Sequence, residues 1–181
     1  SDVMVGADGA LYVADWFDSG VGGHADHDKS WSGTIYRIAP RNFQPRIPRA
    51  DPGTIEGAIS LLCNPAQNVR LAGLQSLKAA GSRAVPAVRE LLNHGNSYVR
   101  ARAIWLLALL GPGGMEVVNS LLEGSPDVET RLVAFRALRN AGEDVPGLVS
   151  KIHRKQPSAA VRREAALAIR DVPARTKQRY L

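Results

Sequence analysis

The sequence predicts a mainly α-helical protein, a right-handed α-solenoid of about four short helix pairs preceded by a small β segment of two to three strands. Two observations carry this prediction. From about residue 64 onward, residues of the same character recur every 30 or 31 positions. A period of this size is typical of stacked repeats, in which each unit buries its apolar face against its neighbours. The first 40 residues lack this period and show short alternating apolar runs instead.

Three columns of the repeat share the spacing of 30, 31 and 31 residues. One column holds the glycine or proline that ends a helix, one holds an arginine near the start of a helix, and one holds a large aliphatic residue. Agreement of three columns is strong evidence for a repeat. The columns are Gly81, Gly111, Gly142 and Pro173; Arg70, Arg100, Arg131 and Arg162; and Leu77, Leu107, Leu138 and Ile169.

Each repeat is expected to contain two helices. The second helix follows a turn with proline or glycine and ends at the glycine column, where a left-handed conformation suits the residue after the helix. Asn68, Ser97 and Asp127 are candidates to cap the second helices. The first helices are expected at roughly 54–63, 84–93, 114–123 and 145–154, with Pro86 and Pro146 in the early turns of two of them.

Small and apolar residues fill two further sets of positions in the second helices. The small residues form a column that we expect where paired helices approach closely. Trp105 and Phe135 are expected at core positions. The small column is Gly73, Ala103, Ala134 and Ala165.

The repeat resembles a short bacterial HEAT repeat. It has a turn, then Val-Arg, then small and apolar residues, and then glycine, whereas the tetratricopeptide and ankyrin periods of about 34 and 33 residues fit less well. The resemblance covers about 120 residues. The third unit departs from it, with Thr130 in place of valine and two extra residues in the preceding segment.

The arginine column has two interpretations. Its resemblance to the ladder arginine of HEAT proteins implies a structural role, in which each planar five-donor fork bonds carbonyls or acidic groups of an adjacent repeat. An electropositive ladder for phosphates is the alternative. Other basic residues are better candidates to contact a ligand, although a solvated face also explains them. They are Arg102, Arg136, Arg139, Arg163 and Arg170.

The β segment is expected to begin with a hairpin. An Asp-Gly turn at residues 8 and 9 is flanked by alternating apolar residues, which is a strong hairpin signal. A third strand is expected from Thr34 to Ala39, followed by a proline-rich connector. Three strands do not make a stable sheet domain by themselves, so the segment either folds back on the first helices or has partners elsewhere.

A second resemblance is carried by two strings, GADGALYVADWFDSGVGGH and SGTIYRIAP. They are similar to the closing blade of glucose/sorbosone-dehydrogenase-like β-propellers. Their junction with short HEAT repeats resembles the large membrane-bound dehydrogenase-like proteins of planctomycete-type bacteria. In that family a propeller precedes HEAT repeats and a c-type haem domain. The resemblance implies a junction piece of a longer parent, periplasmic or otherwise extracytoplasmic, and the start of the chain in mid-pattern fits this expectation.

Four segments are therefore expected. No Cys-x-x-Cys-His motif is present, so no cofactor is expected in this piece, and c-type haem is expected elsewhere in the parent by resemblance. The longest apolar run, Ala103 to Leu110, is too short to span a membrane. The segments are a partial β-propeller blade at 1–40, a connector at 41–52, a HEAT-repeat array at 53–172 and a C-terminal tail at 173–181.

The charge is unevenly distributed. Residues 1–40 carry six acidic and two basic side chains, whereas residues 41–181 carry 11 acidic and 21 basic ones. A basic array can attract nucleic acid, anionic lipid or an acidic partner, although arginine is also a routine structural residue of helical repeats. The single cysteine, Cys63, excludes an internal disulfide and a thiolate metal cluster.

The loop after the second strand holds the densest polar cluster. Its mixture of imidazole and carboxylate can ligate a divalent metal. The spacing matches no established metal motif, and a hydrated loop whose aspartates cap turns is the alternative. The sequence shows no serine–histidine–aspartate arrangement and no phosphate-binding glycine loop, so we predict no catalytic residue. The candidate metal ligands are Asp15, Asp18, His24, Asp26, His27 and Asp28.

These patterns favour a scaffold, a HEAT-repeat module for protein–protein interaction that performs no chemistry of its own. Its partner would be a neighbouring domain of the parent or another protein. Nucleic-acid binding by a basic face is an alternative, which the few aromatic residues of the array disfavour. A metal-binding loop that belongs to an enzyme propeller is another alternative. A HEAT-like lyase acting on a bilin chromophore has only repeat similarity in its favour.

Overall fold

The computed structural model describes residues 2–15, 33–45, 47–153, 158–170 and 172. The chain divides into two compact units, residues 1–76 and 77–181, and the division falls inside a helix. The first unit combines a small β-sheet with helices, and the second is helical. Among the described residues, no helix has both the length and the apolar character needed to cross a membrane.

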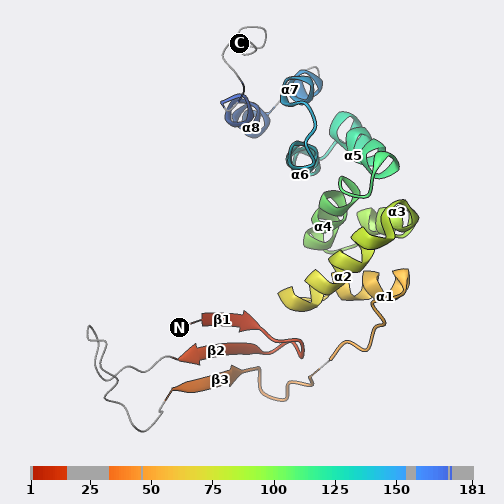
Figure 1. The fold of residues 1–181 in the computed structure, drawn as a ribbon. Helices are drawn as coiled ribbons and strands as arrows, with labels where there is room; N and C mark the ends of the chain where they lie inside the picture. Colours follow the sequence, from red (N-terminus) through yellow and green to blue (C-terminus); the bar gives the residue numbers. More distant parts are fainter. Residues whose placement is uncertain (1, 16–32, 46, 154–157, 171, 173–181) are drawn as a thin grey trace, which may run out of the picture. The chain divides into compact units, whose positions relative to one another are not determined.

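Three antiparallel strands begin the first unit (Figure 1). They are β1 (Asp2–Val5), β2 (Leu11–Asp15) and β3 (Thr34–Ile38), in that order across the sheet. The Gly6 amide donates to the Ala10 carbonyl over 2.8 Å, and Gly9 has a φ of +89°. Glycine suits this left-handed position because it has no Cβ to clash. The predicted Asp-Gly hairpin and third strand are thus confirmed.

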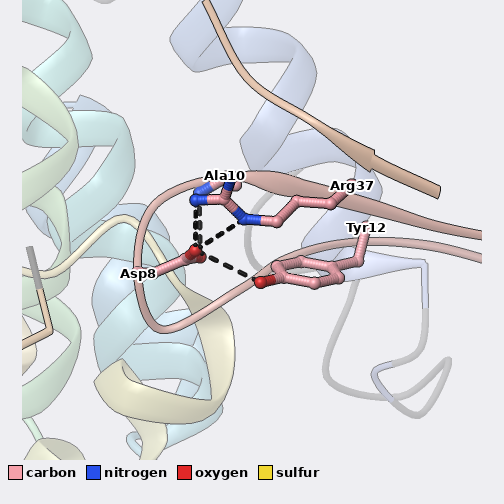
Figure 2. Close-up of polar contacts among 4 residues, drawn as sticks. All are labelled: Asp8, Ala10, Tyr12 and Arg37. Carbon is pink, nitrogen blue, oxygen red and sulfur yellow. Dashed lines mark hydrogen bonds and ion pairs between the residues drawn. The ribbon is translucent and has the colours of Figure 1, made fainter. Parts of the chain in front are cut away.

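Asp8 connects the hairpin turn to β3 (Figure 2). Its carboxylate accepts hydrogen bonds from the Ala10 amide at 3.0 Å and from the Tyr12 hydroxyl at 3.2 Å. It also accepts from Nε and Nη2 of Arg37 at 3.0 and 2.8 Å. The Arg37 guanidinium, followed by the Ala10 amide, holds the pKa of Asp8 below its ordinary value. The Arg37 guanidinium also lies 5.6 Å from the centre of the Phe43 ring. This cation–π contact links the start of the connector, residues 41–52, to the Asp8–Arg37 ion pair.

One face of the sheet is apolar and exposed. Side chains alternate along a strand, so residues that pair across the sheet share a face. Four large side chains of this face are exposed to solvent. A sheet face of this composition is normally packed against another layer. The exposed residues of the face are Val3, Leu11, Tyr36 and Ile38.

The first helix pair consists of α1 (Ile55–Leu62) and α2 (Gln67–Ala80), and the division between the units falls within α2. Gly73 of α2 lies very close to α1, since a Cβ at this position would stand 2.5 Å from the carbonyl oxygen of Ala58. This proximity confirms the close approach predicted at the first member of the small column. Thr54 caps α1 by accepting from the Gly57 amide.

The second unit arranges its helices in two rows (Figure 1). One row contains α3 (Val85–Glu90), α5 (Pro112–Gly124) and α7 (Val145–His153). The other row contains α4 (Ser97–Leu107), α6 (Val128–Asn140) and α8 (Ala159–Ile169). Within this unit α4 packs on α6, and α6 packs on α8. The second helices of three successive repeats therefore lie side by side.

The helix predicted at 84–93 is broken into three pieces. The α-helical part, α3, lies between two 3₁₀ turns, η1 (Gly81–Ala84) and η2 (Leu91–Asn93). Pro86 stands in the first turn of α3, as predicted, where a missing amide donor costs least. Turns of 3₁₀ type are frequent at helix ends, and here they leave an α-helix of 6 residues.

The predicted helix ends are partly confirmed. The three glycines of the glycine column, Gly81, Gly111 and Gly142, have φ values of +59°, +91° and +93°. Gly81 follows α2 and Gly142 follows the C-cap of α6, as predicted. The prediction is wrong at Gly111, because α4 has Ala108 as its C-cap and Gly111 is the N-cap of α5.

Asp127 caps α6 by accepting from two amides of the first turn. The cap prediction is wrong at Ser97, because the side chain of Asn96 caps α4 and Ser97 is its first helical residue. It is also wrong at Asn68, which is the second residue of α2 and accepts from the amide of the next residue.

The aliphatic column forms the core of the array. Leu77, Leu107 and Leu138 are fully buried, and Ile169 is nearly so. Phe135 is also fully buried, as predicted. Trp105 is 37% exposed, so its predicted place in the core is wrong. Trp105 therefore lies on the solvent-facing side of α4.

Candidate interaction surface

The exposed side of α4 carries aromatic side chains. Tyr98 is 73% exposed, and Trp105 lies seven residues further along the helix. Since seven residues make almost two helical turns, the two side chains lie on the same side of α4. Leu109, just beyond the end of the helix, is also exposed. Contiguous exposed apolar surface often marks an interaction site, so this side of α4 is a candidate interaction surface.

A shallow hollow of about 490 Å³ lies next to Trp105. It is lined by the Trp105 side of α4 and by Arg136, Arg139 and Asn140 of α6. Two neighbouring repeats thus place an indole, two guanidinium groups and an amide around one depression. This combination offers apolar contact and hydrogen-bond donors to the same ligand.

An ion pair joins α6 to α8 at the edge of this hollow. Nη2 of Arg136 donates to Oε2 of Glu164 over 2.6 Å. The carboxylate is mostly buried, whereas the arginine side chain is 52% exposed. Glu164 therefore fixes the guanidinium in place and leaves one side of it open to solvent. A second carboxylate is near, because Glu164 first and Glu129 after it raise the pKa of Arg136.

Three arginines lower the pKa of the same carboxylate, that of Glu164. The hydrogen bond from Arg136 holds the pKa of Glu164 below its ordinary value, and the charges of Arg139 and Arg163 lower it further. Charges from both α6 and α8 therefore favour the ionised form of Glu164. We call the group Tyr98, Trp105, Arg136, Arg139, Asn140 and Arg163 the Trp105 surface.

The structure thus brings together three of the five basic residues that the sequence offered as ligand-facing, Arg136, Arg139 and Arg163. The other two belong to the same row of helices. Arg102 is half-buried on α4, and Arg170 is exposed at the C-terminal end of α8.

Sequence reasoning missed the exposure of Trp105, although the repeat contains a signal for it. One column, spaced like the others, contains Gln75, Trp105, Arg136 and Leu167. All four residues are exposed. Because glutamine and arginine occupy this column in two of the repeats, the column faces solvent and the tryptophan in it does too.

The arginine column contacts the turn that precedes each second helix. In Arg70 and Arg100, Nη1 donates to the carbonyls of the residues five and six positions earlier. The distances from Arg100 are 2.8 Å to His94 and 3.1 Å to Gly95. These acceptors belong to the same helix pair, which differs from the bonds to an adjacent repeat that the sequence suggested.

Arg100 nevertheless affects a carboxylate of the next repeat, that of Asp127. Hydrogen bonds from Thr130, together with the charge of Arg100, hold the pKa of Asp127 below its ordinary value. Arg131 differs from the earlier arginines, since its Nε is buried without a hydrogen-bond partner among the described residues. It lies in the third repeat, which also departs most from the repeat pattern. Arg162 is exposed on α8.

Replacing Arg100 with alanine is expected to destabilise the second unit by about 1 kcal/mol, because two turn carbonyls lose a charged donor but can still bond water. Urea unfolding followed by circular dichroism measures the loss. Arg89→Ala is the matched control, since Arg89 is exposed on α3 and makes no hydrogen bond or ion pair with any described residue. Equal stability of the two variants would contradict a structural role of Arg100.

Most of the candidate metal ligands, Asp18, His24, Asp26, His27 and Asp28, lie outside the described residues. Asp15 ends β2. Elsewhere in the described part of the chain, no group of three or more histidine, cysteine or carboxylate side chains is placed to hold a metal ion. The metal site in the loop stays a prediction.

A second hollow, of about 700 Å³, lies in the second unit and is lined by residues of both rows. Its lining includes Arg89 and Glu90 of α3, Arg100 of α4, and Leu121 and Ser125 at the end of α5. No histidine or cysteine is among its lining residues.

The two rows of short helices, with a buried aliphatic column and glycine at the helix ends, define an α-helical repeat protein. Residues 55–139 match the family described as HEAT repeats. The match runs from α1 almost to the end of α6 and confirms the HEAT-repeat part of the sequence prediction. HEAT repeats commonly serve as scaffolds for protein interaction. A comparison with curated proteins gave no match.

Proposed function

We propose that this chain is a HEAT-repeat scaffold that docks a protein partner on the Trp105 surface and performs no chemistry of its own. The observation that supports it most is the exposed pair of Tyr98 and Trp105 beside the guanidinium groups of α6. Tryptophan, tyrosine and arginine are the residues that dominate the free energy of protein–protein binding. Here they gather on rigid, packed helices, which lowers the entropy lost on binding.

The composition of the surface favours protein over nucleic acid. Proteins that bind single strands stack successive bases on several aromatic side chains. The aromatic residues of the Trp105 surface lie on α4, and α6 and α8 contribute arginine, asparagine and an exposed Leu167. Glu129 and Glu164 lie near Arg136 and would repel phosphates. A protein partner is therefore the better match.

The wider setting that we propose follows the resemblance seen in the sequence. The sheet would be part of the closing blade of a β-propeller in a bacterial dehydrogenase-like, extracytoplasmic protein with a c-type haem domain. The exposed apolar sheet face supports this, because a blade packs its faces against neighbouring blades. The array, as a right-handed solenoid, would then hold the propeller and the haem domain in a defined relation.

Site-directed cross-linking tests the scaffold function. Benzoylphenylalanine would replace Tyr98 in the natural protein, in cells that produce it, followed by ultraviolet irradiation. We expect a discrete adduct, in which mass spectrometry identifies the attached peptide. That peptide comes either from another domain of the same polypeptide or from a separate protein.

The control places the same cross-linker at Glu116, an exposed residue of α5 in the other row. The expected result is an adduct at position 98 that is absent at position 116. No adduct at position 98, or the same adducts at both positions, would count against docking on the Trp105 surface.

A further inference from the structure

We propose that the Trp105 surface binds a proline-rich segment of the partner protein in the polyproline II conformation. In this arrangement two prolines three residues apart pack against Tyr98 and Trp105, and carbonyl oxygens of the segment accept hydrogen bonds from side chains of the hollow beside Trp105. The inference rests on the proposed function of the array as a protein-interaction module, and it adds the chemistry of the partner.

The first argument is the spacing of the two aromatic side chains. Tyr98 and Trp105 are exposed on the same side of α4, seven residues apart. This spacing separates the two residues by about 10.5 Å along the helix axis. A polyproline II helix repeats every three residues and advances about 9.3 Å in one repeat. Prolines at positions i and i+3 of such a segment therefore meet the two rings together, and aromatic-lined surfaces are the ones on which proline-rich segments dock.

The second argument is the hydrogen-bonding character of the hollow beside Trp105. The indole N–H of Trp105 can only donate, and the exposed side chain of Asn140 adds amide donors. Neither side chain makes a hydrogen bond with another described residue. A polyproline II segment has no internal hydrogen bonds, and proline has a carbonyl oxygen but no backbone N–H. Such a segment therefore brings acceptors to a hollow that offers donors.

The third argument is the state of the charged groups around the hollow. Arg136 is hydrogen-bonded to Glu164, and the carboxylate of Glu129 also raises its pKa. Arg139 and Arg163 lower the pKa of Glu164 as well. Because these guanidinium groups already interact with carboxylates, the surface strongly attracts neither an acidic nor a basic partner. An uncharged segment complements it, since the aromatic rings and the neutral donors are the groups that remain open.

A titration followed by nuclear magnetic resonance tests the inference. The full chain, labelled with ¹⁵N, would be titrated with decaproline, which adopts the polyproline II conformation. The variant Trp105→Phe assigns the indole signal of Trp105 among those of the 3 tryptophans. We expect this signal to shift progressively and to saturate, because the indole N–H comes to donate to a peptide carbonyl. A decamer of glycine and serine, which is a flexible coil without proline rings, should leave the signal unchanged.

Two variants and a control assign the binding to the surface. Tyr98→Ala should weaken decaproline about fivefold or more, because it removes one of the two rings. Asn140→Ala should weaken it less but measurably. Tyr36→Ala is the matched control, since Tyr36 is 50% exposed on β3 of the first unit, and it should leave the affinity within about twofold of the unsubstituted chain. Circular dichroism melts of every variant keep a loss of binding separate from a loss of folding.

A pair of peptides tests the spacing. Both contain two prolines in the same background of alanine and glutamine, at positions i and i+3 in one peptide and at i and i+2 in the other. The first should bind about threefold more tightly or better, because only residues three apart lie on the same side of a polyproline II helix.

Several results would overturn the inference. One is an indole signal of Trp105 that does not move with decaproline. Others are unchanged affinity in Tyr98→Ala and equal affinity of the two spaced peptides. An oligothymidylate that shifts the Trp105 signal when decaproline does not would assign the surface to nucleic acid instead. A partner cross-linked at position 98 through a segment without proline would keep the scaffold function and reject this inference, whereas failure of both experiments would reject both.

Discussion

Replacing Leu107 with alanine should lower the free energy of unfolding by ~2–5 kcal/mol. Leu107 belongs to the aliphatic column and is fully buried. The substitution removes buried methyl groups and leaves a cavity, because interhelical packing relaxes only partly around a lost side chain. Urea denaturation, followed by circular dichroism, measures the change as a shift of the midpoint at constant slope.

Leu109→Ala provides the control of matched chemistry. Leu109 lies two residues further along the chain, yet it is 38% exposed. Its replacement should cost less than about 1 kcal/mol, since surface substitutions rarely cost more. Similar losses at the two positions would mean that the helical register of α4 is not the one described.

Helix positions and ends were predictable because local chemistry determines them. Gly81 and Gly142 adopt positive φ at the ends of α2 and α6, where the sequence places helix termini. Asp127 caps α6 as its residue type suggests. The cap of α4 was misplaced by one residue because serine and asparagine are adjacent there and both are good caps. The backbone conformation of the turn determines which of two adjacent residues becomes the N-cap, and the repeat pattern does not specify that conformation.

The Trp105 surface was only partly predictable. The sequence indicates the five ligand-facing arginines by their charge, and three of them lower the pKa of Glu164. The partner carboxylate was not foreseen, because Arg136 and Glu164 are 28 residues apart, which matches neither a helical turn nor the repeat spacing. Trp105 was assigned to the core from its apolar character. The column that it shares with Gln75 and Arg136 corrects that error by a purely periodic argument.

The β segment shows a further limit of sequence reasoning. The hairpin follows from its Asp-Gly turn, but the role of Asp8 does not, since Arg37 lies 29 residues away in the sequence. The Asp8 carboxylate both closes the turn and holds β3. Antiparallel pairing brings such residues together, and it depends on register rather than on local composition.

Gly114→Ala should destabilise the array by ~1–3 kcal/mol, although alanine is the better helix former. Gly114 is buried in α5, where a Cβ would stand 2.1 Å from the carbonyl oxygen of Leu107 and 3.3 Å from the Cβ of Leu110. The first contact is far shorter than van der Waals distance and involves backbone, which cannot rotate away. The substitution therefore forces α5 away from the end of α4, and a calorimetric melt should show a lower transition temperature.

Gly113→Ala should have the opposite sign, and the pair of variants makes the test specific. Gly113 is the preceding residue of the same helix, and a Cβ there meets no atom within 4 Å. Alanine at this exposed position should stabilise the protein by ~0.4–1 kcal/mol, because it restricts the unfolded chain without creating a clash. Propensity alone predicts that both variants gain stability. A gain at 113 with a loss at 114 would show that close packing of α5 against α4 outweighs helix propensity at this site, and a gain at both would mean that the helices lie further apart than described.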